Sequence, residues 1–237
     1  MSSKKLLALI KFGHKDHMID LLQNGTIYMK PPSYFRGLPP DNIRSDHNEF
    51  AEESKPIDWM KFQSNDGKEE YEFDRNGKKG PKILNGHWSI VDPTIRMNIY
   101  SMYAITADWS DKHSYIDPRI ARFGDGDPAM VVIQDIGELK KRLMGKLDEL
   151  GFSAKGKPID YYEPNTYKGP VGPFRKSADY SYECEFRLVV NYKEGASYEK
   201  DGALRIQIGS LRDIANIYPA NNVSDIKVEI SDPQPLP

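Results

Sequence analysis

The sequence has little of several features that define large classes of proteins. It contains one cysteine, Cys184, so no disulfide can form within the chain. No apolar run approaches the roughly 20 residues of a membrane-spanning helix. No signal-peptide pattern opens the chain, because charge returns at Lys11. These absences predict a protein of a reducing compartment, the cytoplasm, with no membrane segment.

The chain also lacks an excess of one charge and the common catalytic motifs. It carries 33 Lys and Arg residues against 35 Asp and Glu residues, for a formal net charge of −2. No overall positive field therefore draws it to nucleic acid or to a membrane surface. No GxGxxG, Walker, CxxC or HExxH motif is present. Function is therefore inferred from less specific patterns in the sequence.

The first 36 residues predict a strand, a helix, a second strand and an aromatic turn. Leu6–Phe12 is an apolar run of strand length, and Thr26–Lys30 is a β-branched and aromatic run. Between them, residues 14–24 carry apolar side chains on one helical face, and a glycine follows as a stop. Two prolines end the second strand, and an aromatic pair and an arginine follow directly. Such a unit can line a cleft.

The remaining pattern predicts a single α+β domain over residues 1–230. Leu6–Phe12 and three other apolar segments are expected in its core sheets: Arg96–Thr106, Ala129–Gln134 and Cys184–Asn191. Residues 135–150 predict the strongest helix, with a capping box at its start. Asp-Gly and Asn-Gly pairs predict a β-hairpin insertion at 57–91. Residues 37–55 predict a loop, 175–182 a short helix and 225–230 a closing strand, and the Pro-rich residues 231–237 a disordered tail.

Two polar features interrupt the apolar strands. Alternation places Glu183, Glu185 and Arg187 on one strand face, opposite an apolar face. We expect that polar face to meet a cleft or solvent, with Arg187 pairing a glutamate and keeping it ionised. Ser101 lies inside another strand, where a buried hydroxyl needs a hydrogen-bond partner.

Three segments together resemble a family. LIKFGHKDHMIDLLQNGTIYM resembles the opening of ADP-ribosyltransferase-like folds, closest to the DarT-type toxins and the RNA 2′-phosphotransferase group. NIYSMYAI and ECEFRLVV resemble later blocks of a related family of uncharacterised bacterial proteins. The resemblance implies a split, mixed β-sheet that grips NAD in a cleft. It also implies transfer of ADP-ribose, often by a toxin or phage-defence effector that modifies DNA, RNA or protein and has an antitoxin or partner protein.

The resemblance also assigns roles to particular residues. The family's late glutamate, which binds the ribose 2′-hydroxyl and stabilises the cationic transition state, falls on Glu185, with Glu183 as the second choice. Its middle-strand hydroxyl falls on Ser101 or a nearby tyrosine. Its first-strand Arg or His falls on Lys11 to His14, where Lys11 replaces the usual residue unless His14 takes the role from the turn. An arginine beyond the second strand corresponds to Arg36 or Arg44, and the aromatic residues expected to contact nicotinamide are Tyr28, Tyr34 and Phe35.

Two other functions fit the same residues. A metal-dependent nuclease could hold a hard cation with Asp46, His47 and Glu49 together with the two late glutamates, chiefly through carboxylate oxygens. A non-catalytic module that binds a protein partner needs none of this chemistry. NAD binding, measured with and without EDTA and Mg²⁺, distinguishes the three.

Overall fold

The computed structural model describes residues 6–39, 42–45, 51, 96–106, 116–221 and 223, together with the backbone of four short strands between residues 53 and 90. The candidate metal ligands Asp46, His47 and Glu49 lie outside the described residues, as do the closing strand predicted at 225–230 and the tail predicted at 231–237.

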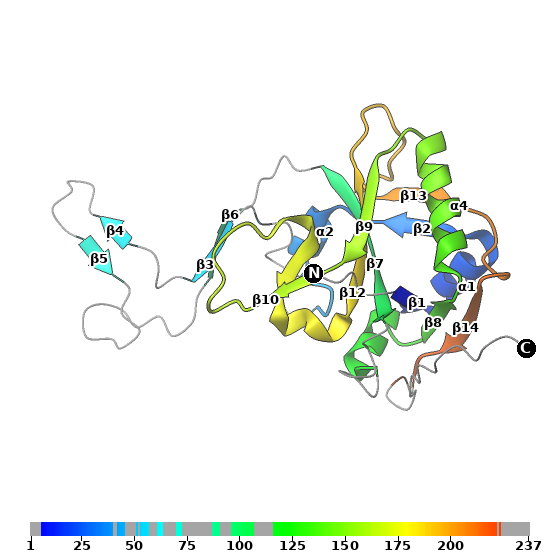
Figure 1. The fold of residues 1–237 in the computed structure, drawn as a ribbon, viewed down its shortest axis with the longest axis horizontal. Helices are drawn as coiled ribbons and strands as arrows, with labels where there is room; N and C mark the ends of the chain where they lie inside the picture. Colours follow the sequence, from blue (N-terminus) through cyan, green and yellow to red (C-terminus); the bar gives the residue numbers. More distant parts are fainter. Residues whose placement is uncertain are drawn as a thin grey trace, which may run out of the picture.

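A six-stranded sheet forms the centre of an α+β fold, and every strand pair in it is antiparallel (Figure 1). The strand order is β14 (Ala215–Pro219), β8 (Pro128–Ile133), β1 (Leu6–His14), β7 (Met97–Thr106), β12 (Glu185–Asn191) and β9 (Ala154–Pro158). Four of these strands are the four predicted core segments, so that prediction is confirmed. Their apolar content follows from burial on both faces of the sheet.

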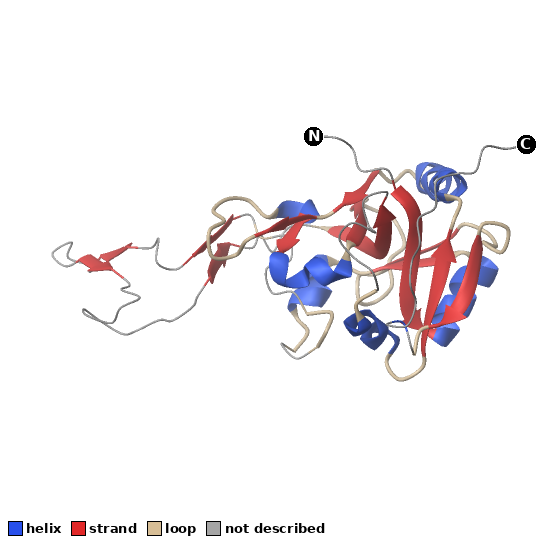
Figure 2. Ribbon diagram, turned by 60° about the horizontal axis from the view of Figure 1, so that its bottom comes forward, coloured by secondary structure: helices blue, strands red, loops and turns tan. Residues whose placement is uncertain are grey.

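The larger core lies on the face of the sheet covered by α1 (Lys15–Asn24) and α4 (Ile136–Glu149). Leu139, Leu143 and Leu147 recur at helical spacing on α4, and all three are buried. The Asp135 side chain accepts from the Glu138 N–H at 2.9 Å, as predicted for the start of this helix. Pro118–Gly124, a 3₁₀ helix labelled η2, covers part of the opposite face (Figure 2).

β1 and β7 separate part-way along their length, and a cavity opens between them. Their ladder stops at Ile10↔Tyr103, whereas β1 stays paired with β8 as far as His14. β2 (Thr26–Met29) pairs with β13 (Leu204–Gln207) in a second sheet. Lys30, just after β2, bridges to Ile99 on the same edge of β7. The edge of β7 between Ile99 and Tyr103 is therefore left open.

Smaller elements complete the described chain. β10 (Asp160–Tyr162) pairs in parallel with β11 (Arg175–Ser177). β3 (Glu53–Pro56) pairs with β6 (His87–Ile90), and β4 (Lys61–Gln63) pairs with β5 (Glu70–Glu72) within the predicted insertion. The short helix predicted at 175–182 is wrong in its first half, because residues 175–177 form β11. The 3₁₀ helix η4 (Ala178–Glu183) follows, and another, η3 (Gly172–Phe174), precedes it. The turn after β2 is a short helix, α2 (Pro32–Arg36).

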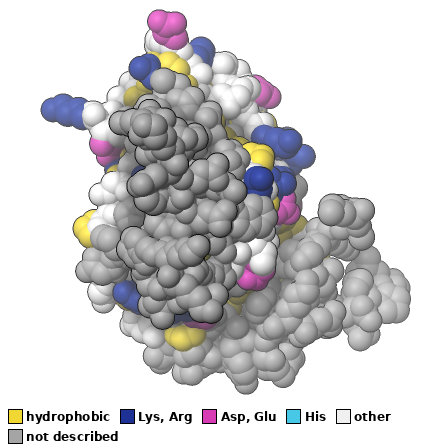
Figure 3. Space-filling model, turned by 90° about the vertical axis from the view of Figure 1, so that its left-hand side faces the viewer, with side chains coloured by type: hydrophobic (Ala, Val, Ile, Leu, Met, Phe, Trp, Pro, Cys, Tyr) yellow, Lys and Arg dark blue, Asp and Glu magenta, His cyan; other side chains and the backbone are white. Residues whose placement is uncertain are grey.

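Two surface properties bear on function. No helix among the described residues is long and apolar enough to cross a membrane. On the face seen in Figure 3, the coloured side chains of described residues include Lys and Arg interspersed with Asp and Glu. This mixture agrees with the nearly neutral composition of the chain.

Candidate active site

A cavity of about 520 Å³ opens where β1 and β7 separate. Its volume lies within the range of small-molecule sites, about 300–1,000 Å³. It brings together nine of the ten residues predicted from the sequence: Lys11, His14, Tyr28, Tyr34, Phe35, Arg44, Ser101, Glu183 and Glu185. Arg36 does not line the cavity, so of the two candidate arginines only Arg44 reaches it. These residues are far apart in sequence, and the tertiary fold alone places them together.

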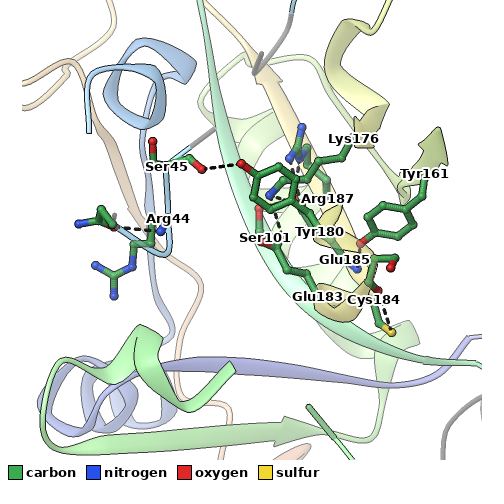
Figure 4. Close-up of polar contacts among 12 residues, drawn as sticks. Arg44, Ser45, Ser101, Tyr161, Lys176, Tyr180, Glu183, Cys184, Glu185 and Arg187 are labelled. Atoms are coloured by element: carbon green, nitrogen blue, oxygen red, sulfur yellow. Dashed lines mark hydrogen bonds and ion pairs between the residues drawn. The ribbon is translucent and has the colours of Figure 1, made fainter. Parts of the chain in front are cut away.

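Glu185 forms the centre of the cavity base, which we define as Ser101, Lys176, Glu183, Glu185 and Arg187 (Figure 4). Its Oε1 accepts from the Ser101 hydroxyl at 2.5 Å and from Arg187 Nε at 2.6 Å. Its Oε2 accepts from Arg187 Nη2 at 3.0 Å. The hydroxyl of the half-buried Ser101 thus has a hydrogen-bond partner inside the strand, as predicted. Arg187 binds the carboxylate through two nitrogens, a strong and directional arrangement.

Of the two environments expected for this polar face, a cleft or solvent, the structure shows the cavity. Glu185 is 3% exposed and Arg187 is 1% exposed. Segments between residues 160 and 183 cover this face: the Tyr161 hydroxyl accepts from the Glu185 N–H at 2.9 Å, and the Pro173 carbonyl accepts from Arg187 Nη1 at 3.0 Å. The carboxylate is therefore held rigidly and away from bulk water.

The charge of Glu185 is maintained in spite of this burial. Burial alone would raise its pKa, but the charges of Arg187 and Lys176 and the hydrogen bonds from Arg187 and Ser101 lower the pKa to about 2. Glu185 is thus a fixed anion at neutral pH. Its Oε2 lies 3.7 Å from Lys176 Nζ, beyond hydrogen-bond distance. Since a carboxylate oxygen accepts two hydrogen bonds, this oxygen can take one from a substrate hydroxyl.

Glu183 reaches the same cavity from a different element than predicted. It ends η4 rather than lying in the strand, and Cys184 between the two glutamates adopts a left-handed conformation, with φ of 40°. Lys176 Nζ donates to Glu183 Oε2 at 2.7 Å. Burial raises the pKa of Glu183 to about 7, with the charge of Glu185 adding to the effect and Lys176 opposing it. The two carboxyl groups therefore differ in protonation near neutral pH.

Two cations, Lys11 and Arg44, face the open edge of β7. Lys11 Nζ donates to the Ser101 carbonyl at 2.7 Å and lies 4.4 Å from the Tyr100 ring centroid. Burial and then the nearby Arg44 charge lower the pKa of Lys11 to about 8, whereas Glu185 opposes the shift. Arg44 donates to the Phe123 carbonyl and lies 3.4 Å from Asp125. Two cations that repel each other across a cavity favour binding of an anionic group between them.

His14 lies at the end of β1, where it caps α1. Its Nδ1 accepts from the Asp16 N–H at 3.4 Å, and its ring meets that of His17 edge-on. Both histidines line the cavity beside the start of α1. Lys11, inside the strand, is thus the residue directed across the gap, and His14 borders it.

Aromatic and basic side chains form the cavity rim, defined as Tyr28, Lys30, Tyr34 and Arg205. Lys30 Nζ lies 4.4 Å from the Tyr34 ring centroid, and Arg205 lies 5.4 Å from that of Tyr28. Lys30 also pairs with Asp201. Phe35 lines the cavity and packs against the buried residues Ile99 and Val189, so it forms a fixed apolar wall.

Sequence patterns missed several residues that line the cavity. Lys176 was missed because its segment was predicted as a helix with no assigned chemistry. Lys30 and Arg205 were missed because two distant strands, β2 and β13, pair to bring them together. Phe123 was missed because it lies on η2, a 3₁₀ helix that no local sequence pattern predicted. A candidate metal centre finds no support in the described part of the chain, where no group of three or more His, Cys, Asp or Glu residues could hold an ion.

Comparison with protein-family models, with curated proteins and with solved structures gives no significant match for this chain.

Proposed function

We propose that this chain is an NAD-dependent ADP-ribosyltransferase of the split-sheet type that its sequence resembles. The observation that carries the proposal is the Ser101–Glu185 pair at the base of a cavity between separating strands. In the family resembled, a hydroxyl residue on a middle strand and a glutamate on a late strand belong to the NAD site. The residues at these two positions, Ser101 and Glu185, lie far apart in the sequence and within hydrogen-bond distance in the structure.

A fixed anion near the reacting carbon would stabilise the transition state of this reaction. When the bond between the ribose carbon and the nicotinamide nitrogen breaks, the electron pair leaves with nicotinamide, which departs neutral. Positive charge then builds on the ribose. Glu185 is buried and ionised, so it can stabilise that charge without reorganisation. The available acceptor position on Oε2 suits the ribose 2′-hydroxyl. An acceptor nucleophile then adds to the ribose carbon and loses a proton.

The remaining cavity residues match the other parts of NAD. Lys11 and Arg44 supply positive charge for the pyrophosphate. Tyr34 and Phe35 provide aromatic surface for nicotinamide, and their rings lie 5.2 Å apart. DNA, RNA, protein and water are all chemically acceptable acceptors. As in the proteins resembled, we expect a cytoplasmic toxin or phage-defence effector controlled by an antitoxin or partner protein.

Calorimetric titration of the wild-type protein with NAD tests the proposal, followed by chromatographic measurement of released nicotinamide. We expect saturable binding and release, both insensitive to EDTA. Cleavage of DNA or RNA that requires Mg²⁺ and stops with EDTA, without nicotinamide release, would favour the metal-dependent nuclease instead. A folded protein that neither binds nor consumes NAD, with DNA, RNA or protein acceptors present, would contradict the proposal and favour the partner-binding module.

A further inference from the structure

A four-residue turn, 42–45, crosses from one side of the cavity to the other. On one side Arg44 donates to the Phe123 carbonyl of η2 and pairs with Asp125. On the other side the Ser45 carbonyl accepts from the Tyr180 hydroxyl of η4 at 3.1 Å. Figure 4 shows this second contact as the dashed line between Ser45 and Tyr180. The turn therefore connects two elements that lie more than 50 positions apart in the sequence.

The turn itself is locally ordered, so a contact at Ser45 is transmitted to Arg44. The Asn42 side chain accepts from the Arg44 N–H at 2.9 Å, and the Asn42 carbonyl accepts from the Ser45 N–H at 2.9 Å. The Ser45 hydroxyl donates to the Leu38 carbonyl at 3.3 Å. These bonds fix the geometry within the turn. Its placement over the cavity still depends on what holds its two ends.

Tyr180 connects the turn to the charged cluster in the cavity base. Lys176 Nζ, which binds Glu183, lies 4.5 Å from the centroid of the Tyr180 ring. Ser45 is 5% exposed, so its hydrogen bond with Tyr180 is shielded from competing water. Arg44 lines the cavity, whereas Tyr180 and Ser45 do not. Tyr180 can therefore influence a bound ligand only through residues that it positions.

We propose that Tyr180 is a positioning residue that holds the 42–45 turn in place and so keeps Arg44 over the cavity for an anionic substrate. The role in catalysis rests on the proposed function, but the effect on the turn does not. Tyr180→Phe removes the hydroxyl and keeps the ring against Lys176. Tyr182→Phe is the matched control, because Tyr182 belongs to the same 3₁₀ helix and its ring stacks on Arg119 at 3.6 Å instead of reaching the turn.

The first experiment is hydrogen–deuterium exchange of peptides covering residues 38–45. Losing one neutral hydrogen bond shifts a local opening equilibrium by about twofold to tenfold. We expect exchange to be faster by that factor in Tyr180→Phe and unchanged in Tyr182→Phe. Equal exchange in wild type and Tyr180→Phe would overturn the proposal, whether or not the protein binds NAD.

The second experiment separates positioning from a general structural role. For nicotinamide release, we expect Tyr180→Phe to raise KM for NAD by about twofold to tenfold, with a smaller change in kcat. In the double variant Tyr180→Phe/Arg44→Met, KM should match that of Arg44→Met alone, because the effect passes through Arg44. If the two substitutions instead raised KM additively in the double variant, Tyr180 would not act through Arg44, and this part of the proposal would be wrong. If wild type does not turn over NAD, the proposed function fails, and exchange at residues 38–45 alone decides the role of Tyr180.

Discussion

The cavity base and the cavity rim each contain a lysine and an arginine but differ in their exposure to water. In the base, Glu185 and Arg187 are almost fully buried and bind each other through two hydrogen bonds. In the rim, the Arg205 side chain is 54% exposed and lies 3.6 Å from Glu199. Solvent screens charges at the rim, whereas charges in the base interact strongly and are costly to separate. We infer that the base determines chemistry and stability and that the rim determines affinity.

Arg187→Met should have the largest effect, because it leaves the Glu185 charge buried without its main partner. We expect the free energy of unfolding to fall by about 3–5 kcal/mol, measured by urea denaturation. The rim control, Arg205→Met, should change it by less than about 1 kcal/mol. The double variant Arg187→Met/Glu185→Leu should recover most of the loss, since no unpaired charge remains. Equal effects of the two single variants would remove the distinction between base and rim.

Local sequence pattern was sufficient to predict four strands of the central sheet but not the environment of the base. The prediction of a mixed sheet was wrong, because every strand pair in the six-stranded sheet is antiparallel. The β12 run is apolar enough to identify a central strand, and alternation placed Glu185 and Arg187 on one face. Their burial depends on β10, β11 and η4, which are short and have no clear period. The left-handed Cys184 also breaks the alternation before the strand, so Glu183 could not be placed by counting.

For the other residues around the cavity, sequence likewise predicted some positions but not the tertiary contacts that bring them together. Sequence predicted that Tyr34 and Phe35 would follow β2 at a cleft, because prolines end the strand there. It could not choose between Arg36 and Arg44, since the position of a turn such as 42–45 is determined by contacts with η2 and η4. Lys11 could be named from its place on the first strand, but its reach to Ser101 depends on where β1 and β7 separate.

The pH dependence of stability should differ between base and rim. Burial raises the pKa of Glu183 in the folded state to about 7, from an ordinary value of 4.5. The folded state therefore binds more protons between these values, and stability falls as pH rises through them, by on the order of 1–3 kcal/mol. The pKa of Glu185 is lowered instead, so its effect on stability has the opposite sign. Its contribution to the free energy of unfolding is lost as pH falls from 4.5 toward 2.

Urea midpoints between pH 4.5 and 7.5 test the Glu183 contribution. The wild-type midpoint should decline over this range, and the Glu183→Gln midpoint should be flatter. At the rim, Asp201→Asn should keep the wild-type slope, because pairing with Lys30 lowers the pKa of Asp201 and it titrates below this range. The same slope in wild type and Glu183→Gln would show that folding does not raise the pKa of Glu183.

Tyr28→Ala should affect binding without affecting folding. Stacking of a base-like ring on an aromatic side chain contributes about 1–3 kcal/mol, so KM for NAD should rise about tenfold. Tyr28 is 36% exposed, and the free energy of unfolding should change by less than about 1 kcal/mol. An exposed aromatic away from the cavity, Tyr218, provides the matched control in Tyr218→Ala. If Tyr28→Ala lowered the free energy of unfolding as much as Arg187→Met does, Tyr28 would contribute to stability, as the base residues do, and not to binding alone.

Cys184→Gly should have the smallest effect. Cys184 has a φ of 40°, a conformation that costs little for glycine and more for other residues. Relief of this strain is partly offset by the greater freedom of glycine in the unfolded chain. We expect stability to change by less than about 1 kcal/mol, in the stabilising direction, by urea denaturation. A marked loss of stability would mean that the Cys184 side chain itself supports the base.

The most direct test of the central claim compares nicotinamide release by wild type, Glu185→Gln and Glu183→Gln. Circular dichroism should first confirm that each variant is folded at the assay temperature, because Glu185→Gln leaves Arg187 without its charged partner. We predict that Glu185→Gln lowers kcat by about 10²–10³-fold, the usual cost of removing one electrostatic stabiliser, and that Glu183→Gln lowers it by less than about tenfold. A folded Glu185→Gln variant with wild-type kcat would contradict the account.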